Sequence, residues 1–286
     1  MSDAPSCSVV VPTHERAGSL RGCLESLAAL DYPRERYEVV VIDDGGREPL
    51  DAVVEPFRER LRVELLAQAR AGPGAARNTG VARAGGELIA FTDDDCRPRS
   101  DWLGRLADRF RAAPEEATGG RTVNALGRNP FSRAAQLVID VGYRQNNEGP
   151  ADRRWFTTNN LAVPAAGFRA VGGFDPTFRT AEDRDFCSRW TAAGLRMAYE
   201  PRAVVEHAHE LTFASFARVH FDYGRGSFRY HRKQRRGGRP VAVEPSFYVT
   251  LTREARGAGL LAPLLLWHVA HTAGFAWEWA RTRAAR

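Results

Sequence analysis

The chain of 286 residues has few cysteines, and they follow no metal-binding pattern. Its four cysteines are Cys7, Cys23, Cys96 and Cys187. They form neither a CxxC pair nor a cluster with histidine. This spacing disfavours a zinc site and predicts reduced, buried thiols.

Several other sequence features are missing as well. The first residues, MSDAPSCSVVVPT, have no basic start followed by an apolar helix and run directly into a strand pattern, so we expect a cytoplasmic protein. We find no internal repeat and no low-complexity linker. With 43% hydrophobic and 10% aromatic residues, the chain can bury the core of one large domain with an appendage.

Positive charge is in excess but unevenly spread. The net charge is +6 and the pI is near 9.5. A basic run, RGSFRYHRKQRRGGR, occupies residues 225–239. Such a run is compatible with nucleic acid, an anionic membrane surface or a solvated helix face. No aromatic stacking platform or known nucleic-acid motif accompanies it, so nucleic acid is not an expected partner.

The first 113 residues alternate between strand and helix patterns. Apolar runs predict strands at residues 8–13, 37–44, 62–66 and 87–91, and patterns of period three to four predict helices at 19–30 and 49–61. A further helix is predicted with the loop ARAGPGAARNTG, residues 69–80. Alternation of this kind predicts an α/β fold with a mostly parallel central sheet flanked by helices.

Two acidic clusters follow predicted strands. Asp43 and Asp44 end one strand, and Asp93, Asp94 and Asp95 follow another. Ligands bind at the carboxyl ends of strands in such sheets, so we expect both clusters at one rim. A solvated turn is the alternative for either cluster alone. Carboxylate oxygens suit Mg²⁺ or Mn²⁺, which would offset the repulsion within the triplet.

The second half mixes element types. Residues 118–124, 154–164 and 196–208 are predicted strands, and 132–144 and 181–194 are predicted helices. From Phe213 the pattern is helical and basic. We therefore expect one domain at 1–210. A helical C-terminal extension follows at 211–286.

Six motifs, in this order and spacing, resemble the family 2 glycosyltransferases with the GT-A fold. They are VVVPTHER, VVIDDGG, GPGAARNTG, FTDDDCRP, GGFD and AEDRDFCSRW. The resemblance covers roughly residues 6–210. It implies that 1–210 is a catalytic domain, with a nucleotide-binding part at about 6–115 and an acceptor-side part at about 116–210. It implies a Rossmann-like GT-A domain that inverts the sugar's configuration and uses a nucleotide-diphosphate sugar as donor.

The resemblance also implies roles for particular residues. Asp93 and Asp95 would be the acids of the family's DxD motif and hold Mn²⁺ or Mg²⁺, with His207 as an extra ligand. Because Asp94 is acidic too, the register of this motif stays open. Asp183, with Glu182 beside it, would be the general base. Asn159, Asn160 and Asp175 would line the acceptor side. The implied nucleotide-binding residues are Pro12, Thr13, Glu15, Asp43, Asp44, Gly74, Arg77 and Asp94.

Three departures from the family pattern are visible. The first motif reads THER where an aromatic residue and an asparagine are frequent, and DDGG lacks the frequent serine. The QxxRW motif of processive synthases is incomplete, because Phe186 takes the place of Gln before Arg189 and Trp190. We therefore expect transfer of one sugar per encounter.

The C-terminal segment 257–277 contains no Lys, Arg, Asp or Glu. It is long enough to cross a bilayer, but Pro263, two histidines and several small residues make it a poor spanning helix. It fits a helix packed on the catalytic domain or one lying at a membrane interface, with Trp267, Trp277 and Trp279 at the boundary. Peripheral attachment to the inner face of the cytoplasmic membrane would bring a lipid-linked or glycan acceptor within reach.

Two other functions compete with sugar transfer. A sugar nucleotidyltransferase also combines an α/β sheet with metal-binding acids, but its Gly-rich, basic signature is expected where this chain has PTHERAG. A catalytically inactive nucleotide- or glycan-binding module would be marked by loss of the metal acids or of the ED pair, and both are present. The oligomeric state is left open.

Overall fold

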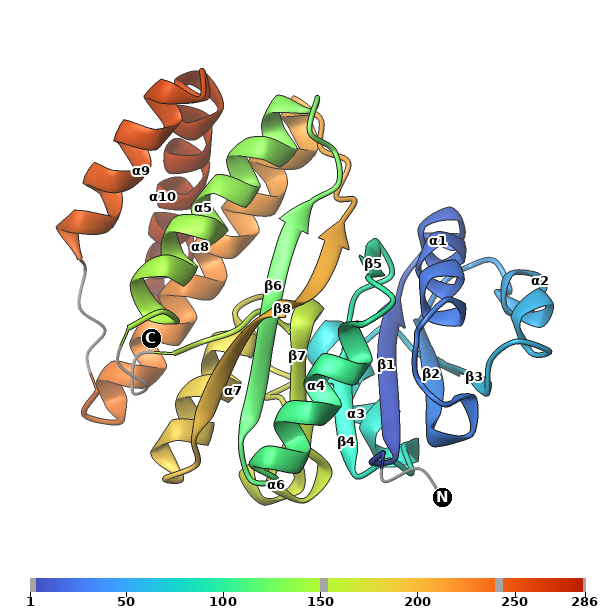
Figure 1. Cartoon of the computed structure of the whole chain (residues 1–286). Coiled ribbons are helices and arrows are strands. Elements are labelled where there is room, and N and C mark those ends of the chain that lie inside the picture. Colours follow the sequence, from blue (N-terminus) through green and yellow to red (C-terminus); the bar gives the residue numbers. More distant parts are fainter. Residues whose placement is uncertain (1–3, 150–153, 240–243, 285–286) are drawn as a thin grey trace.

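One sheet runs through the computed structural model, which describes residues 4–149, 154–239 and 244–284. Its eight strands have the order β3-β2-β1-β4-β7-β6-β8-β5 (Figure 1). The strands are β1 (Cys7–Thr13), β2 (Tyr37–Asp44), β3 (Val63–Gln68), β4 (Leu88–Phe91), β5 (Cys96–Pro98), β6 (Ala117–Asn124), β7 (Leu161–Pro164) and β8 (Met197–His207). The main helices are α1 (Ala17–Ala28), α2 (Asp51–Val54), α3 (Pro73–Arg83), α4 (Trp102–Ala112), α5 (Pro130–Asn146), α6 (Ala165–Val171), α7 (Glu182–Ala192), α8 (Phe213–Arg236), α9 (Pro245–Gly257) and α10 (Leu261–Ala284).

The sheet is buried on both faces. Along β1, Val9 and Val11 belong to a core cluster that includes leucines of α1 and α4, whereas Val10 belongs to a second cluster with residues of α3, α6 and α7. Successive strand side chains point to opposite faces, so a strand covered by helices on both sides must be apolar throughout. The expected α/β fold is confirmed.

The sheet has a parallel half and a mixed half. Strands β1, β2, β3 and β4 are parallel neighbours. Strand β7 joins antiparallel to β4 and β6, while β8 lies parallel to β6 and antiparallel to the short β5. The carboxyl ends of β2 and β4 therefore meet at one rim, as the sequence predicts.

Two predicted elements are shorter than expected. In the predicted strand 154–164 only β7 is a strand, because a 3₁₀ turn (Thr158–Asn160) precedes it and uses asparagine side chains for buried hydrogen bonds. The predicted helix 49–61 is α2 followed by a 3₁₀ turn (Glu55–Phe57), since Pro56 lacks the N–H that a continuous α-helix requires there.

Helices α5, α8, α9 and α10 gather at one end of the molecule, far from α1 and α2 (Figure 1). Helices α8 and α10 approach closely, since a Cβ atom on Gly224 or Gly274 would overlap a backbone carbonyl of the other helix. The buried carboxylate of Glu278 on α10 accepts hydrogen bonds from Arg225 at 3.0 Å and Arg229 at 2.8 Å. These contacts fix α10 against α8.

The basic run 225–239 is therefore not simply a solvated face. Besides the two arginines that bind Glu278, Lys233 contacts Asp175 and Asp185 at 2.8 and 2.7 Å. Three of the seven Lys and Arg residues of this run thus contribute to packing against α7 and α10. Among the helices that the structure describes, none has both the length and the hydropathy to cross a membrane.

Candidate functional site

A cleft of about 760 Å³ opens at the carboxyl rim of the sheet. Strand ends supply its floor: Pro12 and Thr13 from β1, Asp44 from β2, Asp93 and Asp95 after β4, and His207 from β8. The N-terminus of α7 supplies Glu182 and Asp183. Segments up to about 190 residues apart in sequence thus converge on one cleft.

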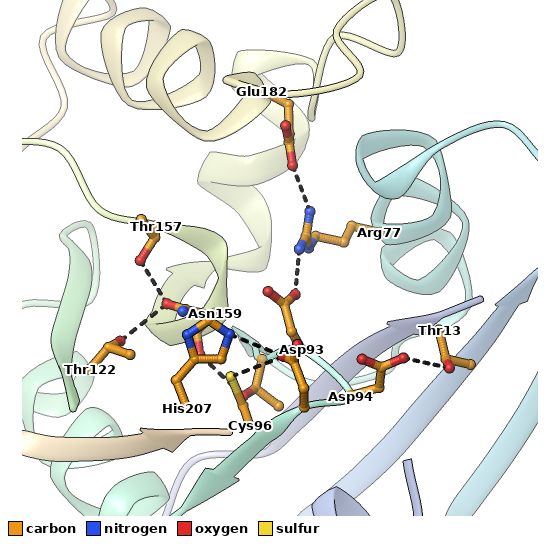
Figure 2. A network of polar contacts seen from close by, with 12 residues as sticks. Thr13, Arg77, Asp93, Asp94, Cys96, Thr122, Thr157, Asn159, Glu182 and His207 are labelled. Carbon is orange, nitrogen blue, oxygen red and sulfur yellow. Dashed lines mark hydrogen bonds and ion pairs between the residues drawn. The ribbon is translucent and has the colours of Figure 1, made fainter. Parts of the chain in front are cut away.

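The three aspartates of the acidic triplet have different surroundings. Asp93 is partly exposed and pairs with Arg77 at 2.5 Å. Asp94 is fully buried and accepts a hydrogen bond from the Thr13 hydroxyl at 2.7 Å (Figure 2). Burial raises the pKa of Asp94 to about 7, against the opposing charge of Arg16. Asp93 and Asp95 face the cleft, whereas Asp94 reaches it only through Thr13 and Arg16.

Asp95 lies between two cationic groups. It contacts Arg16 at 2.8 Å and Nε2 of His207 at 3.3 Å. Burial opposes ionisation of Asp95, but His207 and Arg16 outweigh it and lower the Asp95 pKa. The same contact outweighs burial at His207 and raises its pKa. The antiparallel pairing of β5 with β8, which sets Cys96 opposite His207, makes this contact possible.

Arg77 and Arg16 neutralise the acidic rim. Arg77 on α3 is 3% exposed and bridges Asp93 to Glu182, whose Oε1 lies 2.9 Å away (Figure 2). The sequence predicts that Arg77 binds the nucleotide. In this structure its guanidinium group is paired with the carboxylates of Asp93 and Glu182. The sequence analysis assigns no role to Arg16. Its position three residues after Thr13, in the loop before α1, is the feature of the sequence that could have indicated it as a site residue.

The acids at the end of β2 organise loops. Asp43 accepts a hydrogen bond from the backbone N–H of Gly46 at 2.8 Å. Asp44 accepts from the backbone N–H groups of Ala71 and Gly72, each at 2.8 Å, and from the side chain of Gln68. Burial of Asp44 is outweighed by these hydrogen bonds, so its pKa is lowered. Asp44 thereby holds the loop that begins α3 at the edge of the cleft.

Besides Asp94, three residues predicted to bind nucleotide lie outside the cleft lining: Asp43, Glu15 and Gly74. Glu15 is exposed and pairs with Arg47 at 2.7 Å. Gly74 lies on α3, where an added Cβ would contact Phe174 and Glu182 at 3.3 and 3.6 Å. A side chain there would be tight against Phe174 and in ordinary contact with Glu182.

The ED pair opens α7 after Ala181, which has a left-handed backbone with φ of 67°. Burial raises the pKa of Glu182 to about 7 despite the nearby Arg77, and burial also raises the pKa of Asp183. Glu182 is tied to Arg77, whereas Asp183 accepts only from the adjacent backbone N–H of Arg184 among the described hydrogen bonds. Asp183 is therefore the carboxylate that is free to meet a substrate.

The predicted acceptor residues occupy different places. Asn159 lines the cleft and accepts hydrogen bonds from Thr122 at 3.1 Å and Thr157 at 2.6 Å (Figure 2). Asn160 is fully buried and accepts from the indole of Trp102 at 2.8 Å, outside the cleft lining. Asp175 also lies outside it, paired with Lys233, and its pKa is lowered to about 2 because this contact outweighs burial.

The donor set at the rim fits a hard or borderline divalent cation. Single ligand atoms of Asp95, Cys96 and His207 lie within 4.8 Å of one another. Burial raises the Cys96 pKa well above that of a free thiol, so the Cys96 thiol is protonated when no metal is bound. Asp93, which the sequence also predicts as a ligand, does not belong to this cluster. The Asp95 carboxylate and the His207 imidazole match Mn²⁺ or Mg²⁺.

The fold is similar to that of solved glycosyltransferases. The mannosyltransferase PcManGT from Pyrobaculum calidifontis, in complex with GDP-Man and Mn²⁺, has a TM-score of 0.66 at 20% identity, covering 99% of this chain and 76% of that one. S. aureus TarS 1–349, in complex with UDP-GlcNAc, has a TM-score of 0.61 at 20% identity, covering 96% and 76%. At these identities the likeness establishes the fold alone, which is the GT-A fold of glycosyltransferases.

The chain belongs to glycosyl transferase family 2. The model of that family matches residues 8–177, which confirms the resemblance seen in the sequence. The pre-mycofactocin glycosyltransferase of Mycobacterium tuberculosis is 34% identical over 208 residues, which is 71% of this chain. The match spans only 42% of that relative's length.

Proposed function

We propose that the chain is an inverting, metal-dependent glycosyltransferase that moves one sugar from a nucleotide-diphosphate sugar to an acceptor hydroxyl. The observation that carries the proposal is the common cleft of two acidic groups, the rim acids Asp93 and Asp95 and the helix acid Asp183. The rim acids are suited to bind a cation beside a diphosphate, and Asp183 is suited to accept a proton.

In this mechanism Asp183 removes the proton of the acceptor hydroxyl. The acceptor oxygen forms a bond to the anomeric carbon on the face opposite the nucleotide. The bond from that carbon to the diphosphate oxygen breaks, and its electron pair stays on the diphosphate. The configuration at the anomeric carbon is thereby inverted. Glu182, through Arg77, fixes the start of α7 against the rim.

Asp93, Asp95 and His207 would hold the divalent cation. When bound, the cation neutralises the negative charge that grows on the departing diphosphate. Before it binds, Arg16, Arg77 and His207 balance the rim carboxylates.

The donor end of the cleft is proposed at β1, β2 and the start of α3. There Pro12 and Thr13 line the cleft, and Asp44 holds the Ala71–Gly72 backbone. The structural neighbours support a nucleotide-sugar donor, since one was solved with GDP-Man and Mn²⁺ and the other with UDP-GlcNAc. On this basis we keep the proposed division of the chain into a nucleotide-binding part that contains β1, β2 and α3, an acceptor-side part and a C-terminal extension.

Donor turnover with water as acceptor tests the proposal. We expect Mn²⁺-dependent release of nucleoside diphosphate from UDP-glucose, UDP-GlcNAc or GDP-mannose, and proton NMR should show the opposite anomer in the first free sugar. Retention of configuration would contradict the inverting mechanism. Nucleotide binding without turnover of any donor or acceptor would favour the binding module, and pyrophosphate release from a nucleoside triphosphate and a sugar phosphate would favour the nucleotidyltransferase.

The proposed acceptor is a glycan or lipid-linked hydroxyl compound of cell-envelope polysaccharide, glycolipid or glycoconjugate synthesis. We place the enzyme in the cytoplasm, attached peripherally to the inner membrane face. Exposed apolar side chains on α10 support attachment: Leu261, Leu265, Val269 and Trp277. Trp279 is exposed as well, whereas Trp267, which the sequence predicts at the boundary, is buried.

Vesicle sedimentation tests the attachment. At low salt the chain should sediment with vesicles that contain about 30% anionic phospholipid, and Leu265→Glu combined with Trp277→Glu should abolish this binding because two charges would enter the apolar interface. Full recovery of the unaltered chain in the supernatant would contradict attachment.

A further inference from the structure

The cleft continues well beyond the carboxylates, into a space between α5, α8 and α10. Ala135, Val138 and Ile139 of α5 form one wall of this inner part. His220 and Tyr223 of α8 and Trp267 and His271 of α10 are among the residues that face it. This aromatic end of the cleft is not used by the donor site described above.

The cleft lining here combines aliphatic and aromatic side chains with polar groups that are already engaged. On α5, Ala135, Val138 and Ile139 line the cleft, while Ser132 and Gln136 hydrogen-bond to other protein groups. On α10, Trp267 stacks on His271 at a centroid distance of 5.7 Å. Deep aromatic and aliphatic walls favour flat, apolar groups, whereas a polysaccharide chain would need many polar partners for its hydroxyls.

His220 supplies one polar function inside this apolar space. Its side chain is 4% exposed, and neither ring nitrogen has a hydrogen-bond partner among the described residues. Phe216 and Tyr223 flank it, at centroid distances of 4.3 and 5.5 Å. Buried polar groups without a partner are rare and destabilising, so one in the wall of a cleft points to a ligand atom.

The protonation state of the His220 ring determines which groups it can bind. Burial, with the nearby His271 and His209, lowers the His220 pKa to about 3. The ring is therefore neutral at physiological pH and offers one N–H donor and one acceptor nitrogen. It suits a neutral polar substituent rather than a carboxylate or phosphate.

This inner space is connected to the catalytic end of the cleft. Tyr223 lines the same cleft as Asp183, and the charge of Asp183 adds to burial in raising the Tyr223 pKa. The wall is also rigidly built, because the Gly224 and Gly274 contacts and the Glu278 ion pairs hold α8 and α10 together. A group in this space would thus sit on the acceptor side of Asp183.

We propose that this space is an acceptor subsite for an aryl group that carries one neutral polar substituent, with His220 as the residue that hydrogen-bonds the substituent. The inference rests on the proposed function, since it takes the reacting hydroxyl to lie near Asp183. It names the acceptor class as an aryl-bearing hydroxyl compound rather than an extended polysaccharide.

Binding of small glycosides tests the subsite without catalysis. The probes are 4-nitrophenyl, octyl and methyl β-D-glucopyranoside, titrated by ligand-observed NMR in the presence of UDP and Mn²⁺. We expect the nitrophenyl glycoside to bind at least tenfold more tightly than the methyl glycoside. Equal affinity of these two would overturn the subsite, and preferential binding of the octyl glycoside would overturn its aryl character.

Three variants locate the binding. Ala135→Phe fills the space and should weaken nitrophenyl glycoside binding at least tenfold, and His220→Phe keeps a ring but removes the hydrogen bond and should weaken it about fivefold. The matched control Ala112→Phe, at an exposed position of α4, should change nothing. Unchanged affinity in His220→Phe would overturn the role of His220, even if Ala135→Phe failed to fold. UDP binding with Mn²⁺, measured in the same samples, reports separately on the proposed function.

Discussion

Replacing Asp183 by Asn should lower kcat for sugar transfer by about 10²- to 10⁴-fold while donor binding persists. The amide keeps the size of the carboxylate but cannot take a proton from the acceptor. Asp183 lines the cleft and is not held by another side chain among the described hydrogen bonds. The measurement is the initial rate of nucleoside diphosphate release with acceptor present, together with the Kd of UDP.

The pH dependence of activity is a second test of Asp183 as the general base. Burial raises the Asp183 pKa, so the base becomes protonated at a higher pH than an ordinary aspartate. Activity should therefore fall at a higher pH than an ordinary aspartate would set, and the residual activity of Asp183→Asn should lose this acid limb. Glu182→Gln is the matched control and should retain the limb, since Glu182 is tied to Arg77. Activity of Asp183→Asn within threefold of the original would exclude Asp183 as the base.

Replacing Arg77 by Met should lower the free energy of unfolding by about 3–5 kcal/mol at pH 8, because it leaves carboxylates of a buried cluster without their cation. Arg77 is 3% exposed and contacts Asp93 and Glu182 at 2.5 and 2.9 Å. Chemical denaturation of the two proteins measures the difference. Arg83→Met on the same helix is the control; its partner Glu64 and Arg83 itself are exposed, so the expected change is below about 1 kcal/mol.

The loss should depend on pH in a defined direction. The folded-state pKa of Glu182 is already about 7, above the value of an unfolded glutamate, and removal of Arg77 raises it further. A raised carboxyl pKa disfavours the folded state as pH rises above the unfolded value. The variant should therefore regain stability relative to the original as pH falls from 8 to 5. A difference that is absent at pH 8, or that grows toward pH 5, would contradict a buried ion bridge at Arg77.

The parts of the fold that follow from local pattern were predictable. The continuous apolar run of β1 divides between two cores, with Val10 on one face and Val9 and Val11 on the other. The parallel register of β1 with β2 and β4 then brings the two acidic clusters to one rim. Strand period and strand direction alone imply this outcome.

The rest depends on contacts between distant segments. The pairing of Cys96 with His207 across β5 and β8 brings His207 to Asp95, and no local pattern specifies a strand pair 111 residues apart. The roles of Arg16 and Arg77 as internal cations depend on side-chain geometry in the same way. The aromatic wall of the cleft depends on how α8 and α10 pack, which helical periodicity does not determine.

The most direct test of the central claim is a thermal shift of the purified chain with UDP, GDP and dTDP, each with and without Mn²⁺, repeated on Asp95→Ala. A ligand that binds the native state must raise the Tm. We expect a Mn²⁺-dependent rise in the Tm with at least one nucleotide, and the loss of this rise in Asp95→Ala. A rise that is the same without Mn²⁺ and in the variant, or no rise with any of the three, would contradict a metal-assisted nucleotide site at this rim.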